Sequence, residues 1–212
     1  MIKNHSVLIC LLISALLIVI ATLRYPGGSL LDKNSIGFAW SKNFLSNLFA
    51  TKAINGSENA GWLWALIGMA FHSIGYGIFF INMSKKISPR VWAAILKFIG
   101  YANILFIFLI ATPLHDLGTI SIFLTLIGLF TITVFLLKSR LHFLKLCCIL
   151  CLLTYYCFFF FFGLSYWSLA IIMQKVYIIS SMLLVLGLEY FTNYEDFIQT
   201  KAVPHNPQAT NR

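Results

Sequence analysis

The stretch SVLICLLISALLIVIATL, residues 6–23, contains no charged side chain and decides the class of this protein. A helix needs about 20 mostly apolar residues to cross a hydrocarbon core of about 30 Å. Lipid offers no partners for backbone N–H and C=O groups, so only helices and closed barrels span it. The segment lacks the period-two alternation of a barrel strand, and we therefore expect a transmembrane helix.

Five further stretches of the same kind occupy most of the remaining chain, at residues 62–82, 91–113, 117–137, 144–163 and 166–191. Hydrophobic residues make up 60% of the 212 residues and charged residues only 10%, values that exclude a water-soluble domain. The sequence predicts an all-α polytopic membrane protein, with residues 1–191 forming one six-transmembrane-helix bundle. Residues 192–212 read as a polar cytoplasmic tail that continues briefly as a helix.

Basic residues in the short loops predict the orientation of the bundle, because such loops are retained in the cytoplasm. Two loops carry them, at Lys85, Lys86 and Arg90 and at Lys138, Arg140 and Lys145. Both termini should therefore be cytoplasmic, with the first loop extracytoplasmic. That loop also carries four cations, but it is long, and long loops weigh less. No small-x-small cleavage pattern follows residue 23, so we expect the first span to be retained.

The net charge of +9 comes from cations scattered over loop ends, where they suit an anionic cytoplasmic leaflet. We therefore expect membrane lipids as partners and no nucleic acid. A homo-oligomer and a subunit of a membrane complex both remain open.

The first loop, residues 24–61, contains a short amphipathic pattern. Phe44, Leu45, Leu48 and Phe49 fall at helical spacing, with polar residues including Asn43 and Asn47 on the other side. We expect a short amphipathic helix that folds over the bundle or lies in the interface. One interpretation is a lid that only seals the bundle. In the other, the polar side, continued by Asn59, faces a pocket and holds a polar ligand.

Four segments of this loop carry a resemblance to a known family. They are Tyr25-Pro26-Gly27-Gly28, Gly37-Phe38-Ala39-Trp40, Asn43-Phe44-Leu45-Ser46-Asn47-Leu48 and Asn55-Gly56-Ser57-Glu58-Asn59. Together with the pattern of helices, they resemble the bacterial six-span proteins grouped as domain of unknown function 998. Asn47 stands where that family often has Asp. The resemblance implies a multi-pass protein of the bacterial inner (plasma) membrane, and it says nothing of a substrate or reaction.

Ionisable residues at membrane depth usually face a bundle interior or a water-filled cavity. His72 lies near the middle of the second span, as a hydrogen-bonded packing residue or as a ligand. His115 and Asp116 adjoin at the outer end of spans three and four, where either Asp116 caps the next helix or the two side chains converge, as metal ligands or as a base and the group that orients it. Lys175 lies about 10 to 15 Å deep by helix rise. We expect it to pair with Asp116 or Glu58, either structurally or at a site for an anionic headgroup.

Two functions remain open on these residues. The first is a non-enzymatic bundle that binds a lipid-like or small amphipathic ligand in a polar pocket of the outer leaflet, without a cofactor. Its expected ligand-binding residues are Asn43, Asn47, Asn59, His115, Asp116 and Lys175. The second is a membrane-embedded metal-dependent hydrolase of lipid amides or esters, similar to the ceramidase and adiponectin-receptor superfamily. His115, Asp116 and His72 would then hold zinc and activate water, although the paired His residues of those families are missing from the last span.

Overall fold

The computed structural model describes residues 5–110 and 118–197, and this part of the chain is all-helical. Its α-helices are α1 (Ser6–Arg24), α2 (Trp62–Lys86), α3 (Arg90–Ile110), α4 (Gly118–Leu136), α5 (His142–Gly163) and α6 (Trp167–Phe191). Two 3₁₀ helices, η1 (Leu45–Phe49) and η3 (Tyr194–Phe197), complete the set. Within the described ranges, β structure is limited to two isolated bridges in the first loop. The predicted all-α class is confirmed.

Four of these helices, α1, α2, α5 and α6, are long and apolar enough to cross a membrane. They support the prediction of an integral membrane protein. All six helices fall on the predicted apolar stretches, and α2 runs beyond the predicted end at residue 82 to Lys86. The helix stops just before Pro89, since a proline biases the preceding residue away from the α conformation.

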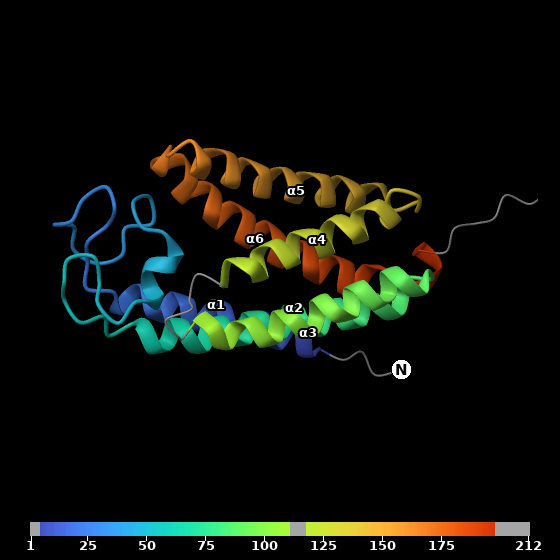
Figure 1. Ribbon diagram of the computed structural model, residues 1–212, viewed down its shortest axis with the longest axis horizontal. Coiled ribbons are helices and arrows are strands. Elements are labelled where there is room, and N and C mark those ends of the chain that lie inside the picture. The colour runs from blue at the N-terminus through green and yellow to red at the C-terminus, as the bar shows by residue number, and fades with distance from the viewer. Residues whose placement is uncertain (1–4, 111–117, 198–212) are drawn as a thin grey trace, which may run out of the picture.

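The helices form two layers, α1 with α2 and α3, and α4 with α5 and α6 (Figure 1). The first loop covers one end of both layers, which we call the loop end. The described chain begins and finishes toward the opposite end (Figure 1). At the loop end, the first loop therefore packs against the ends of helices from both layers (Figure 1).

Small residues on α2 allow its two neighbours in the first layer to approach closely. A Cβ atom at Gly68 or Gly75 would meet side chains of α1 at 3.1–3.3 Å. On another side of α2, a Cβ at Gly77 would lie only 2.4 Å from Ile104 Cγ1, and one at Gly100 would lie 2.7 Å from the Gly77 carbonyl oxygen. Helix pairs in membranes use small residues for this kind of close packing.

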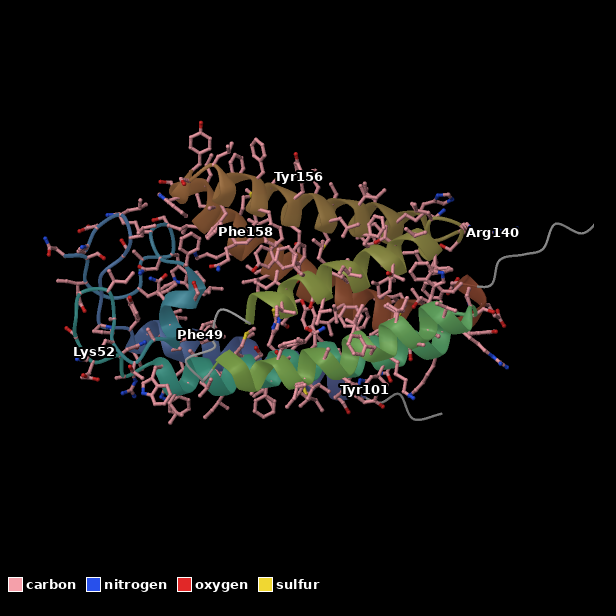
Figure 2. All side chains as sticks on the ribbon, in the orientation of Figure 1. Phe49, Lys52, Tyr101, Arg140, Tyr156 and Phe158 are labelled. Carbon is pink, nitrogen blue, oxygen red and sulfur yellow. The ribbon has the colours of Figure 1, made fainter. Side chains whose placement is uncertain are left out.

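The two layers meet in an apolar core away from the loop end. Phe79 and Phe80 of α2 are fully buried, and Phe80 lies where a Cβ at Gly128 of α4 would sit. On α5, Phe158 points toward α6 whereas Tyr156 points away from the bundle (Figure 2). The aromatic run of α5 thus supplies both packing surface and an outward-facing surface.

Polar contacts join α2 to α6 at the end opposite the loop. Asn82 Nδ2 donates to Glu189 Oε1 at 2.8 Å. Lys86 Nζ donates to the backbone oxygens of Leu188 and Glu189, which places a cation at the C-terminus of α6. The tail then forms η3, whose Phe197 is buried, while the remainder of the predicted tail lies outside the described residues.

Candidate functional site

A glycine-dependent turn sets the path of the first loop. Gly27 and Gly28 have φ angles of +143° and +80°, a region that side chains rarely adopt. The Gly28 carbonyl accepts hydrogen bonds from Asn43 Nδ2 at 2.7 Å and from the Tyr25 hydroxyl at 3.2 Å. The turn therefore fixes Asn43, which stands immediately before the hydrophobic residues of η1.

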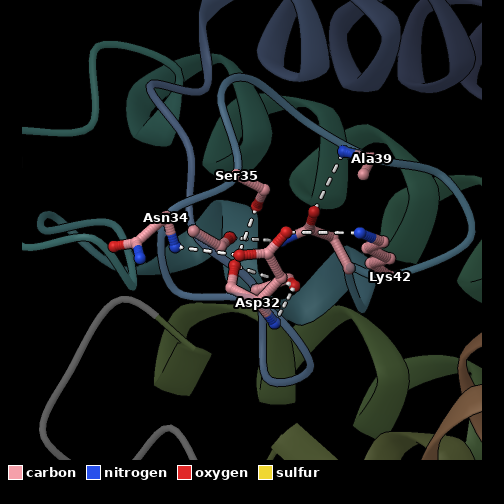
Figure 3. A network of polar contacts seen from close by, with 8 residues as sticks. Asp32, Asn34, Ser35, Ala39 and Lys42 are labelled. Atoms are coloured by element: carbon pink, nitrogen blue, oxygen red, sulfur yellow. Dashed lines mark hydrogen bonds and ion pairs between the residues drawn. The ribbon is translucent and has the colours of Figure 1, made fainter.

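A polar network stiffens the outer part of this loop (Figure 3). The Asp32 carboxylate accepts the Asn34 N–H at 3.1 Å and pairs with Lys42 Nζ at 3.2 Å. Nearby, Asn43 Oδ1 accepts the Ala39 N–H at 2.9 Å (Figure 3). Lys42 and Asp32 are both exposed, so their ion pair adds little stability.

The segment with the predicted amphipathic pattern forms η1, a short 3₁₀ helix that packs onto the loop end. Leu48 is fully buried in a cluster with Ala21 and Ala65 of the first two helices. Asn59 stabilises the C-terminal end of η1, because its Nδ2 donates to the carbonyls of Leu48 and Ala50 at 3.0 and 2.8 Å. Its Oδ1 also accepts the N–H of residue 61, at the start of α2.

Two consecutive side chains of α6 form hydrogen bonds with the backbone of the first loop. Gln174 Oε1 accepts the Leu45 N–H, the first of η1, at 2.7 Å. Lys175 Nζ donates to the Asn43 carbonyl oxygen at 2.7 Å and to that of Ile171 at 3.0 Å. It also lies 6.0 Å from the centre of the Phe38 ring. These contacts tie η1 to the sixth helix, 129 and 132 residues away in sequence.

Beneath η1 lies a cavity of about 1050 Å³, lined by residues of all six helices and of the first loop. Its volume is at the upper end of the roughly 300–1,000 Å³ typical of small-molecule sites. Apolar side chains such as Phe44, Phe49, Trp62 and Met182 make up much of the lining. Figure 2 shows Phe49 at this end of the bundle, between the loop and the helices.

Polar groups are gathered in the part of the cavity nearer the core. The Tyr76 and Ser181 hydroxyls are hydrogen-bonded at 2.7 Å, which links α2 to α6 across the cavity floor. His72 stacks on Tyr76, with ring centres 4.4 Å apart, and its ring nitrogens have no hydrogen-bond partner among the described residues. His72 thus packs by ring stacking and also lines the cavity.

Asn103 of α3 was not singled out from the sequence and is the most informative polar residue of the lining. Its side-chain oxygen accepts the hydroxyls of Ser121 at 2.6 Å and Thr125 at 3.3 Å. Asn103 is 1% exposed, yet its Nδ2 has no acceptor in the described part of the chain. The signal available in the sequence was an amide in the middle of an apolar span, where polar groups are costly.

The structure separates the residues expected to bind a ligand. Asn47 and Lys175 line the cavity, whereas Asn43 and Asn59 lie outside its lining with their amides bonded to loop backbone. The expected pair of Lys175 with Glu58 is wrong, because Glu58 is exposed and the ammonium is held by carbonyl oxygens instead.

The other expected partners of Lys175, namely His115 and Asp116, lie outside the described residues. Within residues 5–110 and 118–197, no group of three or more His, Cys, Asp or Glu side chains could hold a metal ion. The zinc hypothesis therefore depends on residues beyond those ranges. The arrangement that the structure does describe is a ligand-sized, mostly apolar cavity with a few polar groups, which suits binding of an amphipathic molecule.

No protein-family model, curated protein or solved structure matches this chain. The resemblance to the bacterial six-span family therefore stays a prediction.

Proposed function

We propose that this protein binds a lipid-like or small amphipathic molecule in the cavity beneath η1. The observation that carries the proposal is the cavity itself, which is large and mostly apolar and has polar groups at defined places. Amphipathic ligands need both kinds of surface, since their chains are driven from water and their headgroups require hydrogen-bond partners. The loop acts as the roof, held by Gln174 and Lys175 of α6.

The proposal includes a setting for this cavity. All six helices span the inner (plasma) membrane of a bacterium, with both termini in the cytoplasm and the loop end outside. The basic loops support this orientation: Arg140 lies at the end of the bundle opposite the first loop (Figure 2), between α4 and α5. The cavity then lies at the depth of the outer leaflet, and its ligand is a molecule that lipid can supply.

Co-purified lipid tests the proposal when a cavity variant is compared with a matched neighbour. Met182 lines the cavity, whereas Leu183, the next residue of α6, is 65% exposed on the outer surface of the helix. Met182→Trp fills the site and Leu183→Trp does not. After exhaustive detergent exchange, mass spectrometry should find lipid retained by the wild-type chain and by Leu183→Trp, and lost from Met182→Trp.

Absence of retained lipid from the folded wild-type protein would contradict the proposal. Equal retention by all three proteins would contradict it as well, because the lipid would then sit elsewhere on the surface. Elution as a single symmetric species in size-exclusion chromatography serves as the check that each variant is folded.

A further inference from the structure

We infer that the ligand of this cavity carries one negative charge, and that it enters sideways from the outer leaflet between α1 and α6. The ligand class is a monoanionic amphiphile, in which a carboxylate or a phosphodiester is attached to an acyl chain. This inference rests on the proposed function and adds the charge of the ligand and its route.

The charge of the ligand follows from the lining. Lys175 is the single charged residue among the described residues that line the cavity, and it is 9% exposed. Its ammonium touches two neutral carbonyl oxygens, and the described chain places no carboxylate within ion-pair distance of it. A buried charge without a counter-charge is costly, so an anion that enters the cavity gains by neutralising it.

The hydrogen-bond donors of the lining point to the same class. An ammonium has three N–H donors, and Lys175 uses two of them on backbone oxygens. Asn103 adds an amide nitrogen with no acceptor, and its oxygen is already occupied by two hydroxyls that fix its orientation. Unused donors call for a group that only accepts, and a carboxylate or phosphodiester is such a group.

Helix geometry places Lys175 and His72 in the same half of the bundle. Tyr76 and Ser181 mark a common level, since their hydroxyls are bonded at 2.7 Å. Lys175 lies six residues nearer the loop end than Ser181, which is about 9 Å along α6. His72 lies one turn nearer the loop end than Tyr76 and has unpartnered ring nitrogens. Lys175 of α6 and His72 of α2 therefore both lie between the Tyr76–Ser181 contact and the loop, and both line the cavity.

Away from the loop end, the exposed residues of the lining lie on α1 and α6, and they mark the route. Val19 of α1 is 45% exposed and Ile179 of α6 is 57% exposed, and both also line the cavity. Ala15, one turn from Val19, is likewise exposed and part of the lining. Side chains that face both the cavity and the outside surround an opening. The opening is apolar, so it suits an acyl chain extending into lipid rather than a water-soluble anion such as free phosphate.

The protein carries its own probe for this inference, because Trp40 and Trp62 line the cavity. Bromine quenches tryptophan fluorescence at short range, so dibromostearate and its uncharged methyl ester can be compared on the same wild-type chain. A double variant, Trp40→Phe with Trp62→Phe, reports quenching of the other tryptophans by bulk lipid and is subtracted. Brominated phosphatidylglycerol has a net negative charge, and in brominated phosphatidylcholine the phosphodiester is balanced by the lipid's own ammonium group, so its net charge is zero. This second pair distinguishes a free fatty acid from a phospholipid.

We expect the anion of at least one pair to bind about ten- to a hundredfold more tightly than its neutral counterpart, as charge-assisted hydrogen bonds in a buried site provide. Lys175→Gln, which can still donate to the Asn43 carbonyl, should abolish this preference. Ala15→Phe should slow quenching by narrowing the opening, whereas Leu16→Phe, on the neighbouring outward-facing residue, should not.

The outcomes separate this inference from the function on which it rests. Equal, tryptophan-dependent quenching by charged and neutral ligands in both pairs would overturn the charge assignment and leave the binding function standing. Unchanged quenching rates in Ala15→Phe would overturn the route. Quenching that persists fully in the double tryptophan variant would overturn the binding function too.

Discussion

Replacing Gly28 with alanine should destabilise the roof of the cavity more than the same change at Gly56, a glycine of nearly identical conformation. The φ angles are +80° and +85°, so both alanines incur the left-handed strain of about 1–2 kcal/mol. Their surroundings differ. A Cβ at Gly28 would lie 2.4 Å from the backbone nitrogen of Asn55, whereas one at Gly56 meets no atom within 4 Å.

The clash should add about 1–3 kcal/mol at Gly28, the usual cost of overpacking. For a chain of this size, each kcal/mol lowers the melting temperature by about 2–4 °C. Gly28→Ala should therefore melt about 2–12 °C below Gly56→Ala in a thermal scan followed by tryptophan fluorescence in detergent, given those two ranges. The Gly28 carbonyl accepts a hydrogen bond from Asn43, and the Asn43 carbonyl accepts one from Lys175. The Gly28→Ala variant should therefore also retain less lipid than Gly56→Ala.

Equal melting temperatures for the two variants would refute this reasoning, since they share the backbone strain and differ in the contact with the backbone of Ile54 and Asn55. A larger loss in Gly56→Ala would refute it more strongly. Gly37→Ala, with φ at +68° and nothing within 4 Å, is a second control and should resemble Gly56→Ala.

Three other substitutions test single contacts. Asn59→Ala leaves the buried Leu48 carbonyl of η1 without its donor, at a cost of about 1–3 kcal/mol, and also removes the contact with the Ala50 carbonyl. It should speed tryptic cleavage of the loop, whereas the exposed Asn55→Ala should not. Gly77→Ala should cost about 1–3 kcal/mol by thermal melting because its Cβ would strike α3, while Gly163→Ala, with open space around it, should be close to neutral. Tyr76→Phe removes the hydroxyl contact between α2 and α6 and should lower the free energy of unfolding by about 0.5–1.5 kcal/mol in the same assay. A melting temperature equal to that of the wild-type protein would contradict this prediction.

Hydropathy alone placed the helices well, because the requirement for internally bonded backbone in lipid leaves few alternatives to a helix. The helical spacing of apolar residues around Leu48 also indicated which segment of the loop packs onto the bundle, where Leu48 is buried. What it did not give was the kind of helix. The segment forms a 3₁₀ helix that begins at Leu45, with Asn43 left in the turn before it.

The partners of Lys175 show why contacts were harder to predict than helices. An acidic side chain was expected as the partner, but the ammonium donates to a backbone oxygen of the loop, which a sequence pattern does not reveal. Asn43 and Asn47 were expected to act together. Instead, the glycine turn uses the Asn43 amide inside the loop and leaves Asn47 beside the cavity.

Asn103 was missed for a related reason. It is a neutral amide within an apolar span, and it lacks the charge that marks Lys175 in the sequence. Its importance comes from a position facing α4, where two hydroxyls occupy its oxygen and leave its nitrogen unused. No sequence pattern on α3 alone encodes that arrangement.

A density map of the full chain in lipid nanodiscs tests the cavity most directly. We predict elongated density that starts beside Lys175 and Asn103 and leaves the bundle between Val19 of α1 and Ile179 of α6. The account would be contradicted by a map in which the side chains of α1 and α6 pack against each other and leave no cavity beneath η1.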